Sequence, residues 1–208
     1  MMLTRSRFLT AGTALALAGL ALWPSSGAHA FTISITSGQP RLFLHVGNGT
    51  ADGNNATVNL VQVTVTAPQL GTGTPLAMTA DSTQSTSLSG NGSVTCPVPS
   101  QQVMLGAAYR RPNTNARDAI LQVTSPASLS NADGETIPFS EISWVVSEAG
   151  NPSSPVVPAG TFNGATQTLA TVRADTYIET CHSFRFANTA MRAAGTYRGQ
   201  VTYTLSTL

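Results

Sequence analysis

The stretch that decides the fold class is Gly195-Thr-Tyr-Arg-Gly-Gln-Val-Thr-Tyr-Thr-Leu-Ser-Thr-Leu208. From its third residue onward, glycine or an apolar residue alternates with Thr, Arg, Gln or Ser. Successive side chains of a strand point to opposite faces, so this alternation predicts a half-buried β-strand. The expected core face carries Gly195, Tyr197, Val201, Tyr203 and Leu205. A last strand has no later segment to cover its outer edge, so we expect that edge to be covered, blunted or offered to a partner.

Short alternating segments recur along the rest of the chain. They predict strands over residues 31–36, 41–46, 58–66, 94–96, 103–109, 119–124, 141–147 and 178–186. Gly, Asn, Asp and Pro separate them, as at Asn91-Gly92 and Asp133-Gly134. We expect segment 178–186 and the terminal strand to be neighbours. Since no window of helical length has a 3.6-residue apolar period, the sequence predicts an all-β fold, a single antiparallel β-sandwich.

The amino terminus has the pattern of an export signal. Arg5 and Arg7 precede the apolar run 11–22, and Ala28-His29-Ala30 is a small-x-small cleavage motif. We therefore expect residues 1–30 to be a signal peptide cleaved after Ala30, and residues 31–208 to form one domain. The expected location is the periplasm, followed by the cell surface or a fimbrium.

The charge balance bears on the possible binding partners, and the cysteine content bears on the covalent structure. The chain contains no lysine, and the residues after 30 carry eight arginines and nine carboxylates. Because this balance leaves no excess of basic residues, nucleic-acid binding is not expected. In an oxidising compartment, the lone pair Cys96 and Cys181 predicts a disulfide. Closing so long a loop stabilises a fold by about 4–5 kcal/mol in the chain-entropy model.

No catalytic residue stands out. Adjacent strand residues point to opposite faces, so His182 is not expected to activate Cys181. His45 and His182 lack zinc spacing, and the loop with Asn48 and Asp52 offers one carboxylate, so we expect no metal and no cofactor. A hydrolase site formed by carboxylates that come together in the fold remains an alternative. The candidates are Glu135, Glu141, Glu148, Asp175 and Glu179.

Two further segments have a ligand-binding interpretation and a plainer one. Arg110-Arg111 beside Tyr109 is suited to grip an acidic or sugar ligand, but a solvated strand end is the simpler interpretation. Trp144 is suited to stack on a sugar. Because it shares a strand face with Ile142 and Val146, we expect it in the core.

The terminal Gly-Thr-Tyr-x-Gly-x-Val-Thr-Tyr-Thr-Leu resembles the last strand of bacterial pilus subunits assembled by the chaperone–usher route, in which a glycine also stands fourteen residues from the end. The resemblance implies an incomplete immunoglobulin-like sandwich, completed by a periplasmic chaperone and then by an identical or related subunit. It implies a donor strand within 31–37, with donor residues Phe31, Ile33 and Ile35. Thr207 stands where that family usually has an aromatic residue.

The function expected from these features is an exported, non-enzymatic structural or adhesive protein that assembles by strand exchange and contacts a host or surface ligand. In that case the segment 31–36 should stay unpaired in its own chain. Two alternatives remain open: a monomeric carbohydrate- or ligand-binding sandwich, and a secreted hydrolase that uses spatially assembled carboxylates.

Overall fold

A computed structural model describes residues 31–49, 59–89, 92, 94–111, 117–146 and 157–207. Within them the chain forms strands and three short 3-10 helices, Ala67–Gln69, Pro99–Gln101 and Phe139–Glu141. The strands are β1 (Phe31–Ser34), β2 (Arg41–Val46), β3 (Val61–Gln62), β4 (Leu76–Ala77), β5 (Thr79–Ala80), β6 (Val103–Arg110), β7 (Ala119–Thr124), β8 (Ser128–Ser130), β9 (Thr136–Pro138), β10 (Ile142–Val146), β11 (Gly160–Thr161), β12 (Thr166–Val172), β13 (Thr176–Phe186) and β14 (Thr202–Thr207).

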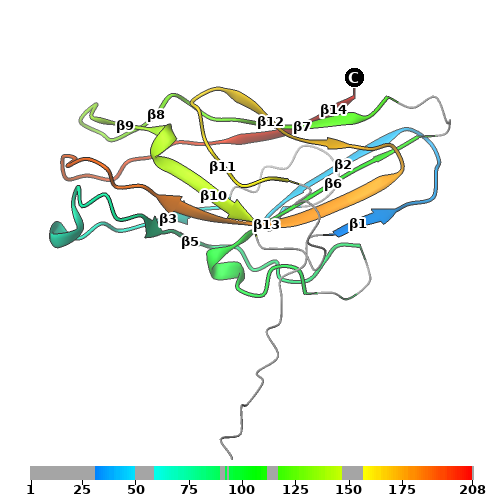
Figure 1. Cartoon of the computed structure of the whole chain (residues 1–208), viewed down its shortest axis with the longest axis horizontal. Helices are drawn as coiled ribbons and strands as arrows, with labels where there is room; N and C mark the ends of the chain where they lie inside the picture. The colour runs from blue at the N-terminus through cyan, green and yellow to red at the C-terminus, as the bar shows by residue number, and fades with distance from the viewer. Residues whose placement is uncertain are drawn as a thin grey trace, which may run out of the picture.

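Two main sheets form the layers of a sandwich (Figure 1). The larger sheet has the order β11-β10-β13-β6-β2, and β1 and β4 also pair with β13. The smaller sheet has the order β12-β7-β14. All named ladders in the described residues are antiparallel, and strands β3–β5 and β8–β9 form two small extra pairs. The predicted all-β antiparallel sandwich is therefore confirmed.

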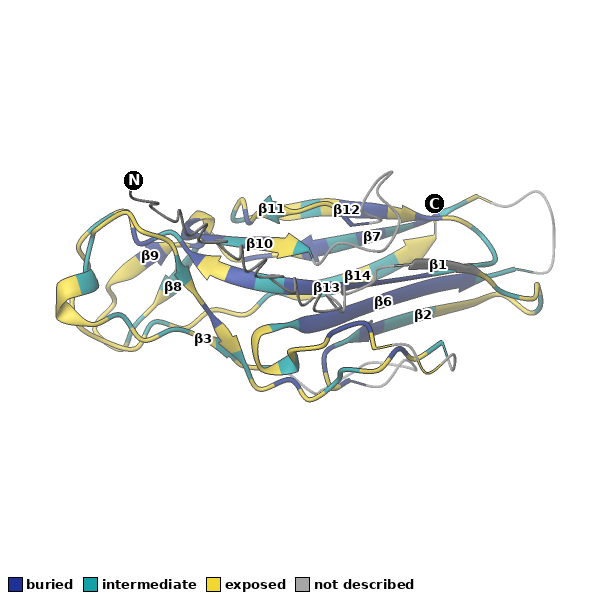
Figure 2. Ribbon diagram, turned by 60° about the horizontal axis from the view of Figure 1, so that its bottom comes forward, coloured by how far each residue is buried: buried dark blue, intermediate teal, exposed yellow. Residues whose placement is uncertain are grey.

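The apolar core lies between the two sheets. Strand β6 contributes Leu105 and Ala107, and β7 contributes Leu121 and Val123, all of them buried. An aromatic cluster continues this core, with the ring centroids of Trp144 and Phe162 lying 4.8 Å apart. Figure 2 shows the burial as a dark band along β6 and β7. Strand β7 thus buries alternate residues, as strand geometry requires, whereas β6 is buried on both faces.

Most of the predicted strands are present, but segment 94–96 forms only an isolated bridge at Val94, and segment 58–66 forms a strand only at Val61–Gln62. Strand β12 and the short strands β4, β5, β8, β9 and β11 were not predicted. Strands β2 and β7 have the predicted bounds, while β6, β10 and β13 differ by only a few residues. Strand β12 escaped prediction because its register against β7 shifts between Thr168 and Ala170. At this bulge the successive residues Leu169 and Ala170 are both buried, so the period of two is broken.

The expected pairing of the last two strands is wrong. Strand β13 belongs to the larger sheet, whereas β14 pairs with β7 in the smaller one. The terminal strand is also shorter than predicted, since the chain first forms a bridge between Arg198 and Ser130. Gly199 lies so close to Leu129 and Phe139 that a Cβ atom would stand 2.7 Å from each side chain. This crossing from one layer to the other separates the two strands.

The amino-terminal segment is paired within its own chain. Strand β1 runs antiparallel to β13, from Phe31 opposite Glu179 to Ser34 opposite Thr176. The same part of β13 pairs with β6 on its other side. The expectation that segment 31–36 stays unpaired in its own chain is therefore not met.

The predicted signal peptide, residues 1–30, lies outside the described residues. Asp52, Glu148 and the side chains of Phe31 and Ile33 lie outside them as well. Among the residues that the structure describes, no helix combines the length and the hydrophobicity needed to cross a membrane.

Candidate functional site

One side of the sandwich is left open between β2 and β14. Strand β2 is the last strand of the larger sheet, and β14 is the last strand of the smaller one. The two strands lie side by side, with Cα atoms within 8 Å, yet no ladder in the described part of the chain joins them. We call this region the open side. The edges of β2 and β14 are therefore adjacent but form no ladder of backbone hydrogen bonds with one another in the described residues.

The core-facing side chains along the open side are incompletely covered. On β14 they are the half-buried Val201, Tyr203 and Leu205, which pack against the core and alternate with exposed residues as predicted. Burial nevertheless raises the pKa of the Tyr203 hydroxyl. On β2, Leu42 is 38% exposed and Leu44 is only half-buried. In the adjoining strands β6 and β7, the core-facing residues are buried (Figure 2).

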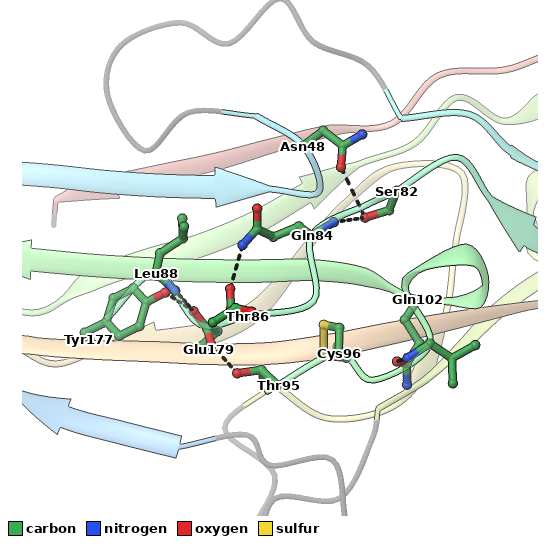
Figure 3. Close-up of a disulfide and its surroundings, with 12 residues drawn as sticks. Asn48, Ser82, Gln84, Thr86, Leu88, Thr95, Cys96, Gln102, Tyr177 and Glu179 are labelled. Atoms are coloured by element: carbon green, nitrogen blue, oxygen red, sulfur yellow. Dashed lines mark hydrogen bonds between the residues drawn. A yellow bond between two sulfur atoms is a disulfide. The ribbon is translucent and has the colours of Figure 1, made fainter. Parts of the chain in front are cut away.

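The outer face of the larger sheet, turned away from this core, is covered by another part of the chain. We call residues 81–102 the excursion; residues 90, 91 and 93 in it are not described. The predicted disulfide is present and joins Cys96 of the excursion to Cys181 of β13, with Cα atoms 5.6 Å apart (Figure 3). Both cysteines are fully buried against Met104. Near the other end, Asn48 Oδ1 accepts a hydrogen bond of 2.8 Å from the Thr83 amide.

Glu179 lies beside this disulfide and is completely buried. Its carboxylate accepts hydrogen bonds from the Thr95 hydroxyl at 2.6 Å, from the Leu88 amide at 3.2 Å and from the Tyr177 hydroxyl. Figure 3 shows these donors converging on the carboxylate. Burial, and then the hydrogen bond to Glu179, raises the pKa of Tyr177. Three donors satisfy the buried acid, which makes it a structural anchor of the excursion.

Gly106 of β6 makes room for this arrangement. A Cβ atom at Gly106 would stand 2.7 Å from the Tyr177 hydroxyl oxygen. Gly106 pairs with His45 on one side and with Glu179 on the other. His45 is 2% exposed, and neither ring nitrogen has a hydrogen-bond partner in the described residues. Burial lowers the pKa of His45, and the charge of Glu179 partly opposes this shift.

The residues considered for catalysis are dispersed. Cys181 faces the excursion, whereas the His182 ring lies in the core, stacked at 6.1 Å on Trp144. Burial lowers the pKa of His182 to about 4. Trp144 is a core residue, as predicted, and its indole N–H donates to the Pro158 carbonyl at 2.9 Å.

The carboxylates considered for a hydrolase have different partners. Glu141 accepts from the Thr189 hydroxyl and forms an ion pair of 3.5 Å with Arg192. Asp175 accepts from the Arg111 amide at 2.9 Å. Neither shares a partner with Glu179, and Glu135 is exposed. Within the described ranges, no group of three His, Cys, Asp or Glu residues is suited to hold a metal ion.

The sequence did not reveal the buried group formed by His45, Tyr177 and Glu179. Its only sequence signal is that His45 and Phe43 alternate with the core-facing residues of β2. Searches against protein-family models, curated proteins and solved structures found no match to this chain.

Proposed function

We propose that this chain is an exported, non-enzymatic structural or adhesive protein that assembles by β-strand exchange, as in chaperone–usher pilus subunits. The observation that supports this proposal is the open side. It combines two strand edges that are unpaired in the described residues with the partly exposed apolar side chains of Leu42, Leu44, Val201, Tyr203 and Leu205. An added strand supplies backbone hydrogen bonds to a free edge, and its alternate side chains cover the apolar row.

The proposed donor is segment 31–36 of a neighbouring copy. Phe31, Ile33 and Ile35 alternate at the period that the open side requires. In the self-paired form, the segment is held by the short ladder of β1 on β13. Exchange replaces this ladder with a longer one along the edge of β2 or of β14. A periplasmic chaperone would occupy the open side before the neighbouring copy does.

The test is the oligomeric state of protein purified from the periplasm after expression of the full chain. Each apolar donor residue buried in a neighbour contributes roughly 1.5–3 kcal/mol. We therefore expect Ile33→Asp to abolish assembly, measured by size-exclusion chromatography with light scattering, while circular dichroism stays unchanged. The matched control is Thr32→Asp, on the opposite face of the same strand, which should assemble. A monomeric wild type that unfolds when residues 31–36 are deleted would show an ordinary structural strand and refute the proposal.

A further inference from the structure

A cavity of about 470 Å³ opens on the outer face of the larger sheet. The sheet supplies Phe43 and His45 from β2, Ala108 and Arg110 from β6, and Tyr177 from β13. Leu88 of the excursion and Ile35, which follows β1, form the side walls. Ligand sites in proteins have volumes of about 300–1,000 Å³ and mostly apolar walls with a few polar groups. The size and the walls of this cavity fit that description.

The cavity exists because small residues occupy the middle strand. Gly106 and Ala108 of β6 lie between larger side chains of β2 and β13. Ala108 is directly opposite Phe43 on one side and Tyr177 on the other. The two aromatic side chains therefore stand on either side of the small Ala108 side chain, and this shape suits a flat or slender apolar group.

Two arginines mark one end of the cavity. Arg110 lines it, and Arg41 is directly opposite Arg110 across the β2–β6 ladder. The Arg41 guanidinium carbon lies 5.0 Å from the centroid of the Phe43 ring. In the described residues no carboxylate forms an ion pair with Arg110, whose Nε–H donates to the Gln39 carbonyl at 3.2 Å. Its guanidinium charge is therefore available to an anion at this end of the cavity.

The other end presents an unsatisfied polar group. His45 lines the cavity, is 2% exposed and has two ring nitrogens without a partner among the described residues. A buried polar group without a hydrogen bond is costly, so such a group in a native fold calls for an explanation. The neighbouring Glu179 is already satisfied by three donors, which leaves His45, among the described residues that line this cavity, as the buried polar group without a hydrogen-bond partner.

From these contacts we infer that the outer face binds a small carboxylate with an apolar or aromatic body. The carboxylate lies at Arg110, and the body lies over Ala108 between Phe43, Tyr177 and Leu88. Guanidinium groups bind carboxylates with strong, charge-assisted hydrogen bonds. The site uses the outer face of β2, whereas strand exchange uses its edge and inner face. Ile35, a wall of the cavity, belongs to the segment that exchange removes, so the cavity is complete in the self-paired form of the chain.

The test is isothermal titration calorimetry on the monomeric fraction of the periplasmic protein with 4-phenylbutyrate. We expect saturable binding of one molecule per chain. The alcohol 4-phenyl-1-butanol lacks the charge and acetate lacks the apolar body, so each should bind at least about tenfold more weakly. Absence of saturable binding of 4-phenylbutyrate, or equal affinity for the alcohol, would overturn the inference.

Matched variants place the ligand in this cavity. Leu88 is 44% exposed, so charged replacements there leave the fold intact. Leu88→Glu should weaken binding of 4-phenylbutyrate about tenfold, and Leu88→Lys should not. Arg110→Gln should also weaken it about tenfold. The controls are Val98→Glu, at an equally exposed position of the excursion that does not line the cavity, and Arg185→Gln on β13. Equal effects of Leu88→Glu and Val98→Glu, or unchanged binding by Arg110→Gln, would refute the site.

Discussion

The outer face of the larger sheet and the open side differ in how their side chains are covered. On the outer face, Glu179 is completely buried, yet three donors of the same chain satisfy it and a disulfide fixes the covering segment. On the open side, Leu205 is only half-buried, although its cross-strand partner Leu121 is completely buried. The chain thus satisfies the buried charge of Glu179 internally, whereas at the open side it leaves apolar side chains only half-covered.

This difference indicates where free energy remains for association. Each Å² of apolar surface removed from water contributes roughly 25 cal/mol. The half-covered residues of β2 and β14 can still gain that energy from a partner strand, and the free edges add backbone hydrogen bonds. The outer face around Cys96 and Glu179 is held by a disulfide and hydrogen bonds of the same chain, so changes there should affect folding and not assembly.

The largest expected effect is the loss of the disulfide. The bond closes a separation of 85 residues, and removing it with Cys96→Ala and Cys181→Ala together should lower the free energy of unfolding by about 4–5 kcal/mol. Urea denaturation followed by tryptophan fluorescence measures this loss. As a control, wild-type protein reduced under denaturing conditions and refolded with reductant should have the same midpoint as the double variant. A midpoint equal to that of the oxidised wild type would contradict the prediction.

Replacement of Glu179 should have the next largest effect. Glu179→Ala leaves the Thr95 and Tyr177 hydroxyls and the Leu88 amide without their acceptor. Each unsatisfied buried donor costs about 1–3 kcal/mol, and with partial relaxation we expect a total loss of about 3–4 kcal/mol. Urea denaturation is again the measurement. Glu179→Gln retains one acceptor and should lose less, while Glu135→Ala at an exposed position should stay within about 0.5 kcal/mol of wild type.

Two leucines that pair across strands allow the core and the open side to be compared with the same substitution, leucine to alanine. Leu121 of β7 and Leu205 of β14 lie directly opposite one another, and only Leu121 is fully buried. Leu121→Ala should lower the free energy of unfolding by about 3 kcal/mol, and Leu205→Ala by about 1 kcal/mol. Under strand exchange, only Leu205→Ala should weaken assembly out of proportion to its effect on folding. Equal losses in urea denaturation would show that the open side is already covered.

The sequence was sufficient for the features that depend on local alternation. It predicted the bounds of β2 and β7, the exposed and half-buried alternation over residues 201–206, and the core position of Trp144. The lone cysteine pair was sufficient for the disulfide. In each case a period of two, or the absence of any other partner, left one interpretation.

Features that depend on distant segments were not predictable. The bond between Thr95 and Glu179 joins residues 84 positions apart, and nothing local marks Glu179 as buried. The bulge at Leu169 hides β12, because two successive buried residues break the alternation. The placement of β13 and β14 in different sheets depends on the bridge of Arg198 to Ser130, which a short connection does not reveal.

The last expected effect is a pH dependence of stability that originates between the sheets. Burial lowers the pKa of His182 to about 4, against 6.5 for an exposed histidine. Because the unfolded chain binds the proton more tightly, stability is fully present above pH 6.5 and is lost as the pH falls toward 4. At pH 5 the loss from His182 is about 2 kcal/mol. His45, whose pKa burial also lowers, acts in the same direction from the outer face.

Urea denaturation of wild type and of His182→Gln at pH 7 and pH 5 separates the two histidines. The variant is expected to be less stable at both pH values, because a polar amide replaces a ring packed on Trp144. The informative quantity is therefore the difference between pH 7 and pH 5, which should be smaller in His182→Gln by about 2 kcal/mol. A stability difference between pH 7 and pH 5 that persists in His182→Gln and disappears in the double variant His182→Gln/His45→Gln originates from His45 on the outer face. Identical pH dependences of wild type and His182→Gln would show that the core histidine does not titrate in this way.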